Sequence, residues 1–277
     1  MRPAVGVMLN NLERDRLEAF CVAAERGFRV VHTSALAERF LTGPERGQYV
    51  EAARASGLAI HTMFVGFDGQ SYADLATIRR TVGLVLPEYQ EHRWRVTLLY
   101  SDLARDLGIT ALGIHLGFIP HYAGHPHYAP LVRAVRGLLD RFAGRGQALH
   151  LETGQEPARV LLRFLRDVGR PNLAVNFDPA NLVLYGTDEP LAALDLLGPH
   201  VRGVHCKDAL PPTRPDALGT EVPLGQGVVD FPALLARLAA LGYDGPLVIE
   251  REHGPRVFED VDAARAYLES LLPALPA

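Results

Sequence analysis

Lysine is nearly absent from this chain of 277 residues: Lys207 is the only one, and the other 27 basic side chains are arginine. Acidic residues outnumber basic ones, and the formal net charge is −4. A chain without a basic surplus lacks the electrostatic field that attracts a nucleic-acid backbone. The composition therefore argues against a nucleic-acid partner, and it draws attention to the one position where a lysine stands.

Cysteine and long apolar runs are also scarce. The two cysteines, Cys21 and Cys206, fall in apolar segments of different predicted elements, which indicates buried thiols in a reducing cytosol and not a disulfide. No apolar run approaches the roughly 20 residues of a membrane helix, and the N-terminal stretch shows no signal-peptide pattern. We therefore expect a cytoplasmic protein without a membrane partner.

Short β-rich segments recur along the whole chain. Their brevity and continuous hydrophobicity are typical of parallel strands that are buried on both faces. The segments between them place apolar residues three and four positions apart, as amphipathic helices do. The predicted strands are residues 4–9, 28–33, 58–64, 111–117, 148–153, 173–178, 201–206 and 246–251.

Local signals support three of the intervening helices, which begin near Leu131, Ala158 and Phe231. Gly169 stands where the second of them should end, and Asp230 is a suitable N-cap for the third.

Eight alternations of strand and helix in 277 residues match the size and rhythm of a (β/α)8 barrel. An open doubly wound sheet is the main alternative. It would usually carry a glycine-rich phosphate turn after the first strand, and MLNNLERD contains no glycine. No linker-like shift of composition interrupts the chain. We predict an α/β protein that forms a single (β/α)8 TIM barrel domain over residues 1–277.

Four side chains of metal-binding type stand at the ends of the last four predicted strands: Glu152, Asp178, His205 and Glu250. In such a barrel the C-terminal strand ends carry the active site, and neighbouring strands are about 4.8 Å apart. Taken singly, a carboxylate at a strand end is most often a helix cap, a member of an ion pair or a solvated side chain. Three carboxylates and one imidazole at equivalent positions instead predict one divalent ion, Mn²⁺ first, with Mg²⁺, Co²⁺ or Zn²⁺ as alternatives.

The segments ALHLETG, NFDPAN, VHCKD and PLVIERE, with PLGQGVVDF before the last, resemble the sugar phosphate isomerase/epimerase family. That family shares the xylose isomerase-like (β/α)8 fold and includes ketose 3-epimerases, hydroxypyruvate isomerases, inosose dehydratases and endonucleases. The similarity covers essentially the whole chain and is most specific from His150 to Glu252. It implies that the four residues named above bind a divalent ion and that, as in the epimerases, Glu152 and Glu250 move the proton.

The sequence departs from the family pattern at Asn181, where many members have a histidine. Asparagine can hydrogen-bond a substrate hydroxyl, but it cannot act as a base. The endonuclease members also need an Asp-x-His after the seventh strand, which KDALPPTRPDALG lacks. We therefore do not expect nuclease activity, and we predict that His61 and His115, on the third and fourth strands, contact substrate together with Asn181.

Glu152 and Glu250 are predicted to act on a substrate with a carbonyl beside a hydroxyl. An ion between them would bind both oxygens and stabilise the enediolate that forms when the intervening carbon loses a proton. One glutamate would take the proton and the other return it, to the opposite face for epimerisation or to the next carbon for isomerisation. Which glutamate has which role is left open.

Lys207 shares strand parity with His205, so both are expected to face the barrel mouth while Cys206 faces outward. Lys207 is then predicted to hydrogen-bond a substrate oxygen, with an ion pair to one of the glutamates or to Asp208 as alternatives. The segment 65–80, after the third strand, is typical of a mobile lid.

Three functions are compatible with these residues. The first is a metal-dependent isomerase or epimerase acting on a sugar or sugar phosphate. The second is a lyase that dehydrates a keto-inositol or keto-acid. The third is a non-catalytic metal- or sugar-binding protein. We predict a small-molecule carbohydrate as the partner, and a homo-oligomer is compatible with each function.

Overall fold

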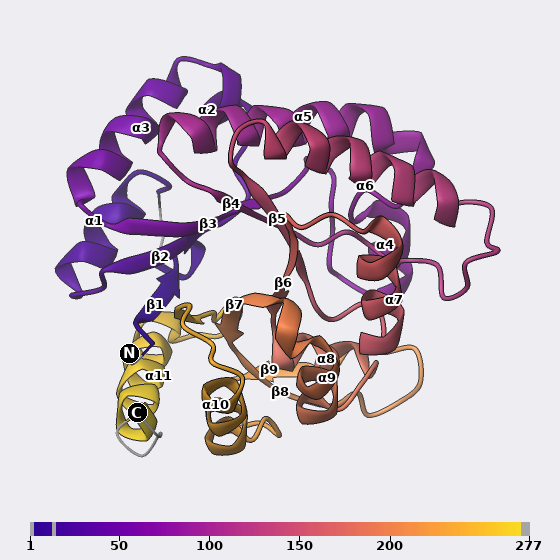
Figure 1. Cartoon of the computed structure of the whole chain (residues 1–277). Coiled ribbons are helices and arrows are strands. Elements are labelled where there is room, and N and C mark those ends of the chain that lie inside the picture. Colours follow the sequence, from indigo (N-terminus) through magenta and orange to yellow (C-terminus); the bar gives the residue numbers. More distant parts are fainter. Residues whose placement is uncertain (1–2, 13–14, 273–277) are drawn as a thin grey trace.

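The computed structural model describes residues 3–12 and 15–272, and its strands close into a barrel of eight parallel strands (Figure 1). Around the barrel the order is β1, β10, β7, β6, β5, β4, β3 and β2, so each strand lies beside its predecessor in the chain once the short β8 and β9 are set aside. The barrel strands are β1 (Val5–Met8), β2 (Val30–Thr33), β3 (Ala59–Val65), β4 (Ala111–Ile114), β5 (Ala148–Glu152), β6 (Leu173–Phe177), β7 (Val201–Cys206) and β10 (Leu247–Ile249). The predicted (β/α)8 barrel is confirmed, and each predicted strand overlaps an observed one.

Helices surround the barrel on its outer side (Figure 1). The α-helices are α1 (Glu18–Glu25), α2 (Glu38–Thr42), α3 (Glu45–Ser56), α4 (Leu75–Thr81), α5 (Pro87–Asp106), α6 (Tyr128–Ala143), α7 (Ala158–Val168), α8 (Pro179–Tyr185), α9 (Pro190–Leu197), α10 (Phe231–Ala240) and α11 (Val257–Leu271). Two short 3₁₀ helices are η1 (Leu9–Leu12) and η2 (Gly198–His200). None of the helices in the described ranges is long and apolar enough to cross a bilayer.

Two of the predicted helix signals have the expected geometry. Helix α7 ends at Gly169, whose φ of 57° is in the left-handed region that glycine adopts without strain. Helix α10 begins after Asp230, whose carboxylate accepts a hydrogen bond from the backbone N–H of Ala233 at 3.0 Å. Local sequence therefore sets these helix ends without help from distant parts of the chain.

The barrel interior is only partly apolar. Met8, Phe64 and Val248 form a small apolar cluster that is separate from the main core. Polar side chains lie beside them, including His32 and His205, which are both fully buried. Buried imidazole nitrogens need hydrogen-bond partners inside the barrel. For His205 these partners include the side chains of the site at the barrel mouth.

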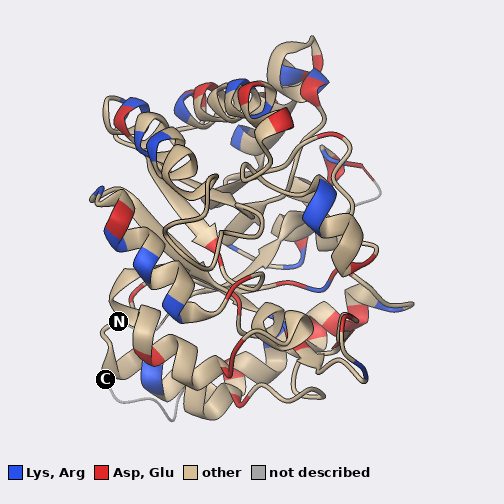
Figure 2. Cartoon of the chain, turned by 90° about the vertical axis from the view of Figure 1, so that its right-hand side faces the viewer, with Lys and Arg blue, Asp and Glu red and all other residues tan. Residues whose placement is uncertain are grey.

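Acidic and basic residues are interspersed along the outer helices (Figure 2). This interleaving agrees with the balanced composition and the formal charge of −4. Such a mixture of charges along the described helices does not favour binding of a polyanion.

A small antiparallel sheet follows β7, and the sequence did not predict it. Strand β8 (Asp208–Leu210) pairs with β9 (Thr220–Val222). Strands of three residues are too short to show a period, and the segment between them is rich in proline. The Asp208 carboxylate anchors this connection, because it accepts hydrogen bonds of 2.9 to 3.1 Å from the backbone N–H groups of Ala209, Gly225, Gly227 and Val229.

Replacing Asp208 by alanine should lower the free energy of unfolding by roughly 2–4 kcal/mol, because several backbone donors would lose their acceptor in a mostly buried place. Urea unfolding followed by circular dichroism measures the change. The control is Asp230→Ala, which removes an exposed helix cap and should cost only about 1 kcal/mol. Equal losses in the two variants would contradict the anchoring role of Asp208.

Candidate active site

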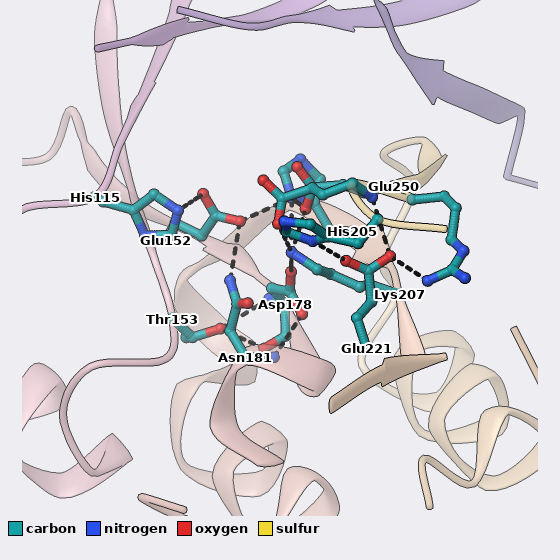
Figure 3. Close-up of polar contacts among 12 residues, drawn as sticks. His115, Glu152, Thr153, Asp178, Asn181, His205, Lys207, Glu221 and Glu250 are labelled. Atoms are coloured by element: carbon teal, nitrogen blue, oxygen red, sulfur yellow. Dashed lines mark hydrogen bonds and ion pairs between the residues drawn. The ribbon is translucent and has the colours of Figure 1, made fainter. Parts of the chain in front are cut away.

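Four side chains of the last barrel strands converge at the barrel mouth (Figure 3). Glu152 is the last residue of β5, Asp178 and Glu250 directly follow β6 and β10, and His205 is the penultimate residue of β7. All four are buried, with exposures between 0% and 7%. One ligand atom from each lies within 4.8 Å of those of the other three. The structure thus brings together the four residues that the strand-end pattern singled out.

His205 is at the centre of this acidic cluster, defined as Glu152, Asp178, His205 and Glu250. Its Nδ1 lies 2.8 Å from Oε1 of Glu152, 3.1 Å from Oε2 of Glu250 and 3.9 Å from Oδ2 of Asp178. Each of these oxygens therefore points toward one small region. Three carboxylate oxygens and one imidazole nitrogen are a donor set suited to Mn²⁺, Mg²⁺ or Co²⁺.

Asp178 supplies an independent sign that the cluster fits a cation. Its Oδ1 caps helix α8 by accepting from the N–H of Asn181 at 2.9 Å, while its Oδ2 is buried and has no hydrogen-bond partner within residues 3–12 and 15–272. Burial, together with the neighbouring charges of Glu250 and Glu152, raises the pKa of Asp178 to about 7, although Lys207 opposes this. A divalent ion would relieve this crowding of carboxylates, so the residues present fit such an ion.

Lys207 lies beside the acidic cluster and is 3% exposed. Its Nζ is 3.3 Å from Oε2 of Glu250, 2.6 Å from Oε2 of Glu252 and 3.9 Å from Oδ2 of Asp178. Burial alone would lower the pKa of Lys207, but the surrounding carboxylates, Glu250 first, raise it well above its ordinary value. For Glu250, burial has the opposite effect and raises the pKa. The positive charges of Lys207 and His205 outweigh burial, so the pKa of Glu250 falls to about 2. The alternative of a pair between Lys207 and Asp208 is wrong, since Asp208 binds backbone N–H groups.

Glu152 is held from two sides. Its Oε2 lies 3.0 Å from Nε2 of His115, and its Oε1 accepts from Nδ2 of Asn181 at 3.4 Å. Both neighbours are thus within reach of a molecule bound at Glu152. The sequence predicts both as substrate contacts, His115 from its place after β4 and Asn181 from the family resemblance.

A cavity of about 570 Å³ opens above the acidic cluster. Its lining includes Glu152, Asn181, Lys207, Glu250 and His115, while Asp178 and His205 lie fully buried beneath it. Among the described residues His61 does not line this cavity. It lies deeper in the barrel, and we therefore leave it out of the proposed substrate contacts.

Two tyrosines of the cavity were missed from the sequence. Tyr72 lies on the segment after β3 that was predicted to be a lid, and its ring centre is 5.6 Å from that of His115. Tyr185 is the last residue of α8 and lines the cavity together with Asn181 of the same helix. The lid prediction could have drawn attention to Tyr72, but no local pattern distinguishes Tyr185 from a core aromatic.

Glu156 is a further buried carboxyl near the site, and its Oε2, like Oδ2 of Asp178, has no hydrogen-bond partner among the described residues. Burial raises the pKa of Glu156 from 4.5 to about 8, with His115 and a hydrogen bond from Ile119 opposing the shift. The unfolded chain therefore releases this proton at lower pH than the folded protein does. The stability that the protonated carboxyl contributes is therefore lost as the pH rises from 4.5 to about 8.

Replacing Glu156 by glutamine should remove this loss. We expect the variant to gain stability relative to the unchanged protein between pH 4.5 and about 8, reaching roughly 2–4 kcal/mol at the upper end. Urea unfolding at a series of pH values measures the difference. Parallel stability curves for the two proteins would show that Glu156 titrates normally.

Solved structures of other proteins share this architecture. A xylose isomerase domain protein from Planctomyces limnophilus is 38% identical, with a TM-score of 0.89 and 98% of each chain covered. A xylose isomerase-like TIM barrel protein from Mycobacterium smegmatis, in complex with magnesium, is 19% identical, has a TM-score of 0.71 and covers 100% of this chain and 98% of its own. D-allulose 3-epimerase from Methylomonas sp., in complex with D-allulose, is 18% identical, with a TM-score of 0.72 and 97% of both chains covered. The likeness to the last two shows the fold alone.

Curated relatives match over shorter stretches. The uncharacterized protein YihM of Escherichia coli is 29% identical over 47% of this chain and 41% of its own length. The rhizopine catabolism protein MocC of Rhizobium meliloti is 29% identical over 63% of this chain and 62% of its own. Inosose dehydratase of Geobacillus thermodenitrificans is 27% identical over 50% of this chain and 52% of its own. The matched stretches thus span about half the length of these relatives.

The family-level match covers far more of the chain. A family model described as xylose isomerase-like TIM barrel matches residues 20–272, which include all four members of the acidic cluster. The resemblance based on the segments around Glu152, Asp178, His205 and Glu250 is thereby confirmed at the level of the family. The chain belongs to the xylose isomerase-like TIM barrel family.

Proposed function

We propose that the protein is a divalent-metal-dependent isomerase or epimerase of a sugar or sugar phosphate, which works by removing a proton next to a carbonyl. One observation carries the proposal. Glu152 and Glu250 approach the same atom, Nδ1 of His205, from β5 and β10 on either side of β7, and both line the cavity. Two carboxylates that face one point from different sides suit removal of a proton by one and its return by the other.

The acidic cluster would hold the ion, with Mn²⁺ proposed first and Mg²⁺, Co²⁺ or Zn²⁺ as alternatives. His205 would contribute Nδ1 and the three carboxylates one oxygen each, because these are the atoms that converge. When bound, the ion would supply Lewis-acid polarisation of a carbonyl and its neighbouring hydroxyl. The magnesium complex of the Mycobacterium smegmatis protein is consistent with a divalent ion in a barrel of this fold.

The side chains around the cluster have complementary roles in this proposal. One glutamate takes the proton from the carbon next to the carbonyl, and the other returns it to the opposite face or to the adjacent carbon. Lys207 and His115 line the cavity and would stabilise the negative charge that develops on substrate oxygens. Asn181 would orient a hydroxyl, since its amide is a donor already directed at Glu152.

A dehydratase is the second candidate, and the inosose dehydratase match at 27% identity favours it. A dehydratase would begin with the same proton removal and then expel a β-hydroxyl as water. D-Allulose 3-epimerase has the same fold, which is consistent with the first candidate. Both candidates place the first chemical step at the two glutamates.

Deuterium uptake tests the proposal. The Mn²⁺-loaded protein is incubated in heavy water with a panel of ketoses, keto-inositols and small keto-acids, and the products are analysed by mass spectrometry. Uptake at a carbon next to the carbonyl is expected. Retention of the substrate's composition apart from deuterium identifies an isomerase or epimerase, and loss of a water molecule identifies a dehydratase.

The metal-free protein is the control, and it should give no uptake above the background of buffer. No uptake across the panel, with bound Mn²⁺ verified by elemental analysis, would count against both candidates. It would favour a protein that binds a metal or a sugar without turnover.

A further inference from the structure

A row of three histidines extends from the acidic cluster into the barrel interior. Nε2 of His205 lies 3.0 Å from Nδ1 of His32, and Nε2 of His32 lies 3.1 Å from Nδ1 of His61. His205 and His32 are fully buried. Nδ1 of His205 thus faces the carboxylates, and Nε2 of the same ring faces His32.

A bulge in β3 brings the third histidine into this row. Val31 of β2 pairs with Ile60, whereas His32 pairs with Thr62, so His61 is the extra residue of β3. Nδ1 of His61 also lies 2.9 Å from the hydroxyl of Thr62. His61 lines a separate cavity of about 580 Å³ at the end of the barrel where the strands begin.

The hydrogen positions follow from these partners once an ion occupies the cluster. The ion would use the lone pair of His205 Nδ1, so the hydrogen of that ring must be on Nε2. Nε2 of His205 then donates to Nδ1 of His32, and the hydrogen of His32 must be on its own Nε2. That nitrogen donates to Nδ1 of His61, whose single lone pair is the acceptor at the end of the row.

We infer that His32 is a positioning residue: it accepts the hydrogen bond from Nε2 of His205 and so keeps Nδ1 of His205 turned toward the ion with a free lone pair. The inference rests on the proposed function, because it needs a divalent ion at the acidic cluster. Metal-bound histidines generally donate their second nitrogen to such a partner, and loss of the partner typically weakens metal binding by about 10–100-fold. Partners of this kind are usually carboxylates or carbonyls, whereas here a neutral imidazole passes the hydrogen bond on to His61.

Two variants separate the hydrogen bond from simple packing. His32→Asn keeps an acceptor oxygen near the position of Nδ1 but loses ring volume, and His32→Phe keeps the ring but offers no acceptor. We expect Mn²⁺, measured by titration calorimetry on the metal-free proteins, to bind His32→Phe about 10–100-fold more weakly than the unchanged protein. His32→Asn should lose less than about fivefold, as a partial rescue. A role in packing alone predicts the opposite order.

Nuclear magnetic resonance of isotope-labelled histidines in the unchanged protein gives a second test that does not depend on the variants folding. With Mg²⁺ bound, both His205 and His32 should carry their hydrogen on Nε2. A hydrogen on Nδ1 of His32, or undiminished Mn²⁺ binding by His32→Phe, would overturn the inference and leave the proposed function intact. Failure of the unchanged protein to bind either ion would overturn both.

Discussion

Glu152→Gln and Glu250→Gln should each lower kcat/KM by about 10²–10⁴-fold in the deuterium-uptake reaction while leaving the barrel folded. Glutamine has nearly the size of glutamate and keeps an oxygen that can accept a hydrogen bond, but it does not take up a proton at neutral pH. Each glutamate faces Nδ1 of His205 and lines the cavity, whereas the third carboxylate of the cluster, Asp178, does not line it. Circular dichroism checks the fold, and assays at saturating Mn²⁺ separate loss of chemistry from weaker metal binding.

Glu252→Gln is the matched control. Glu252 stands two residues after Glu250 and pairs with Lys207 at 2.6 Å, but it belongs to a more exposed position outside the acidic cluster. Its loss should reduce kcat/KM by less than about tenfold, because it removes a charge near the site without removing a proton acceptor. Full turnover in both Glu152→Gln and Glu250→Gln would exclude these glutamates as the acid and base.

Lys207→Met should change catalysis and metal binding in opposite directions. Methionine preserves much of the side-chain volume but removes the ammonium group that lies 3.3 Å from Glu250. We expect kcat to fall by about 10²–10³-fold, since a donor aimed at developing negative charge is lost. Mn²⁺ should bind more tightly, because a cation no longer competes for the carboxylates of Glu250 and Asp178.

The metal-free Lys207→Met protein should also be less stable, because buried carboxylates lose their partner, and added Mn²⁺ should restore its unfolding temperature. Lys207→Arg is the control that keeps the charge, so its Mn²⁺ affinity should stay closer to that of the unchanged protein. Thermal unfolding and calorimetric titration of the three proteins, with and without Mn²⁺, measure these effects. Weaker Mn²⁺ binding by Lys207→Met would show that the lysine supports the cluster structurally and does not compete with the ion.

The barrel and the convergence of the acidic cluster could be predicted because both depend on local features. A parallel strand buried on both faces is a short continuous apolar run, and this pattern located all eight barrel strands. Parallel strands also end at the same side of a barrel. Glu152 at the end of one strand and Glu250 at the end of another were therefore expected to meet although they are far apart in the chain.

Other features depended on contacts that no local pattern encodes. Lys207 could have paired with the adjacent Asp208, yet the fold brings Glu250 and Glu252 to it and directs Asp208 to backbone N–H groups of a distant loop. His61 was expected to contact substrate, but it is only the third residue of β3, and next to a one-residue bulge it lies against His32.

By itself, the sequence determined which segments become barrel strands and which side chains stand at their ends. A strand buried on both faces is a continuous apolar run, and in a barrel of parallel strands the last residues of each run lie at the same end. Only the tertiary structure decided which nitrogen of His205 faces the carboxylates and that His32 meets the other. It also decided which acids neutralise Lys207. These are hydrogen bonds and ion pairs between strands remote in the chain, and their partners follow from strand register and bulges set by the packing of the whole barrel.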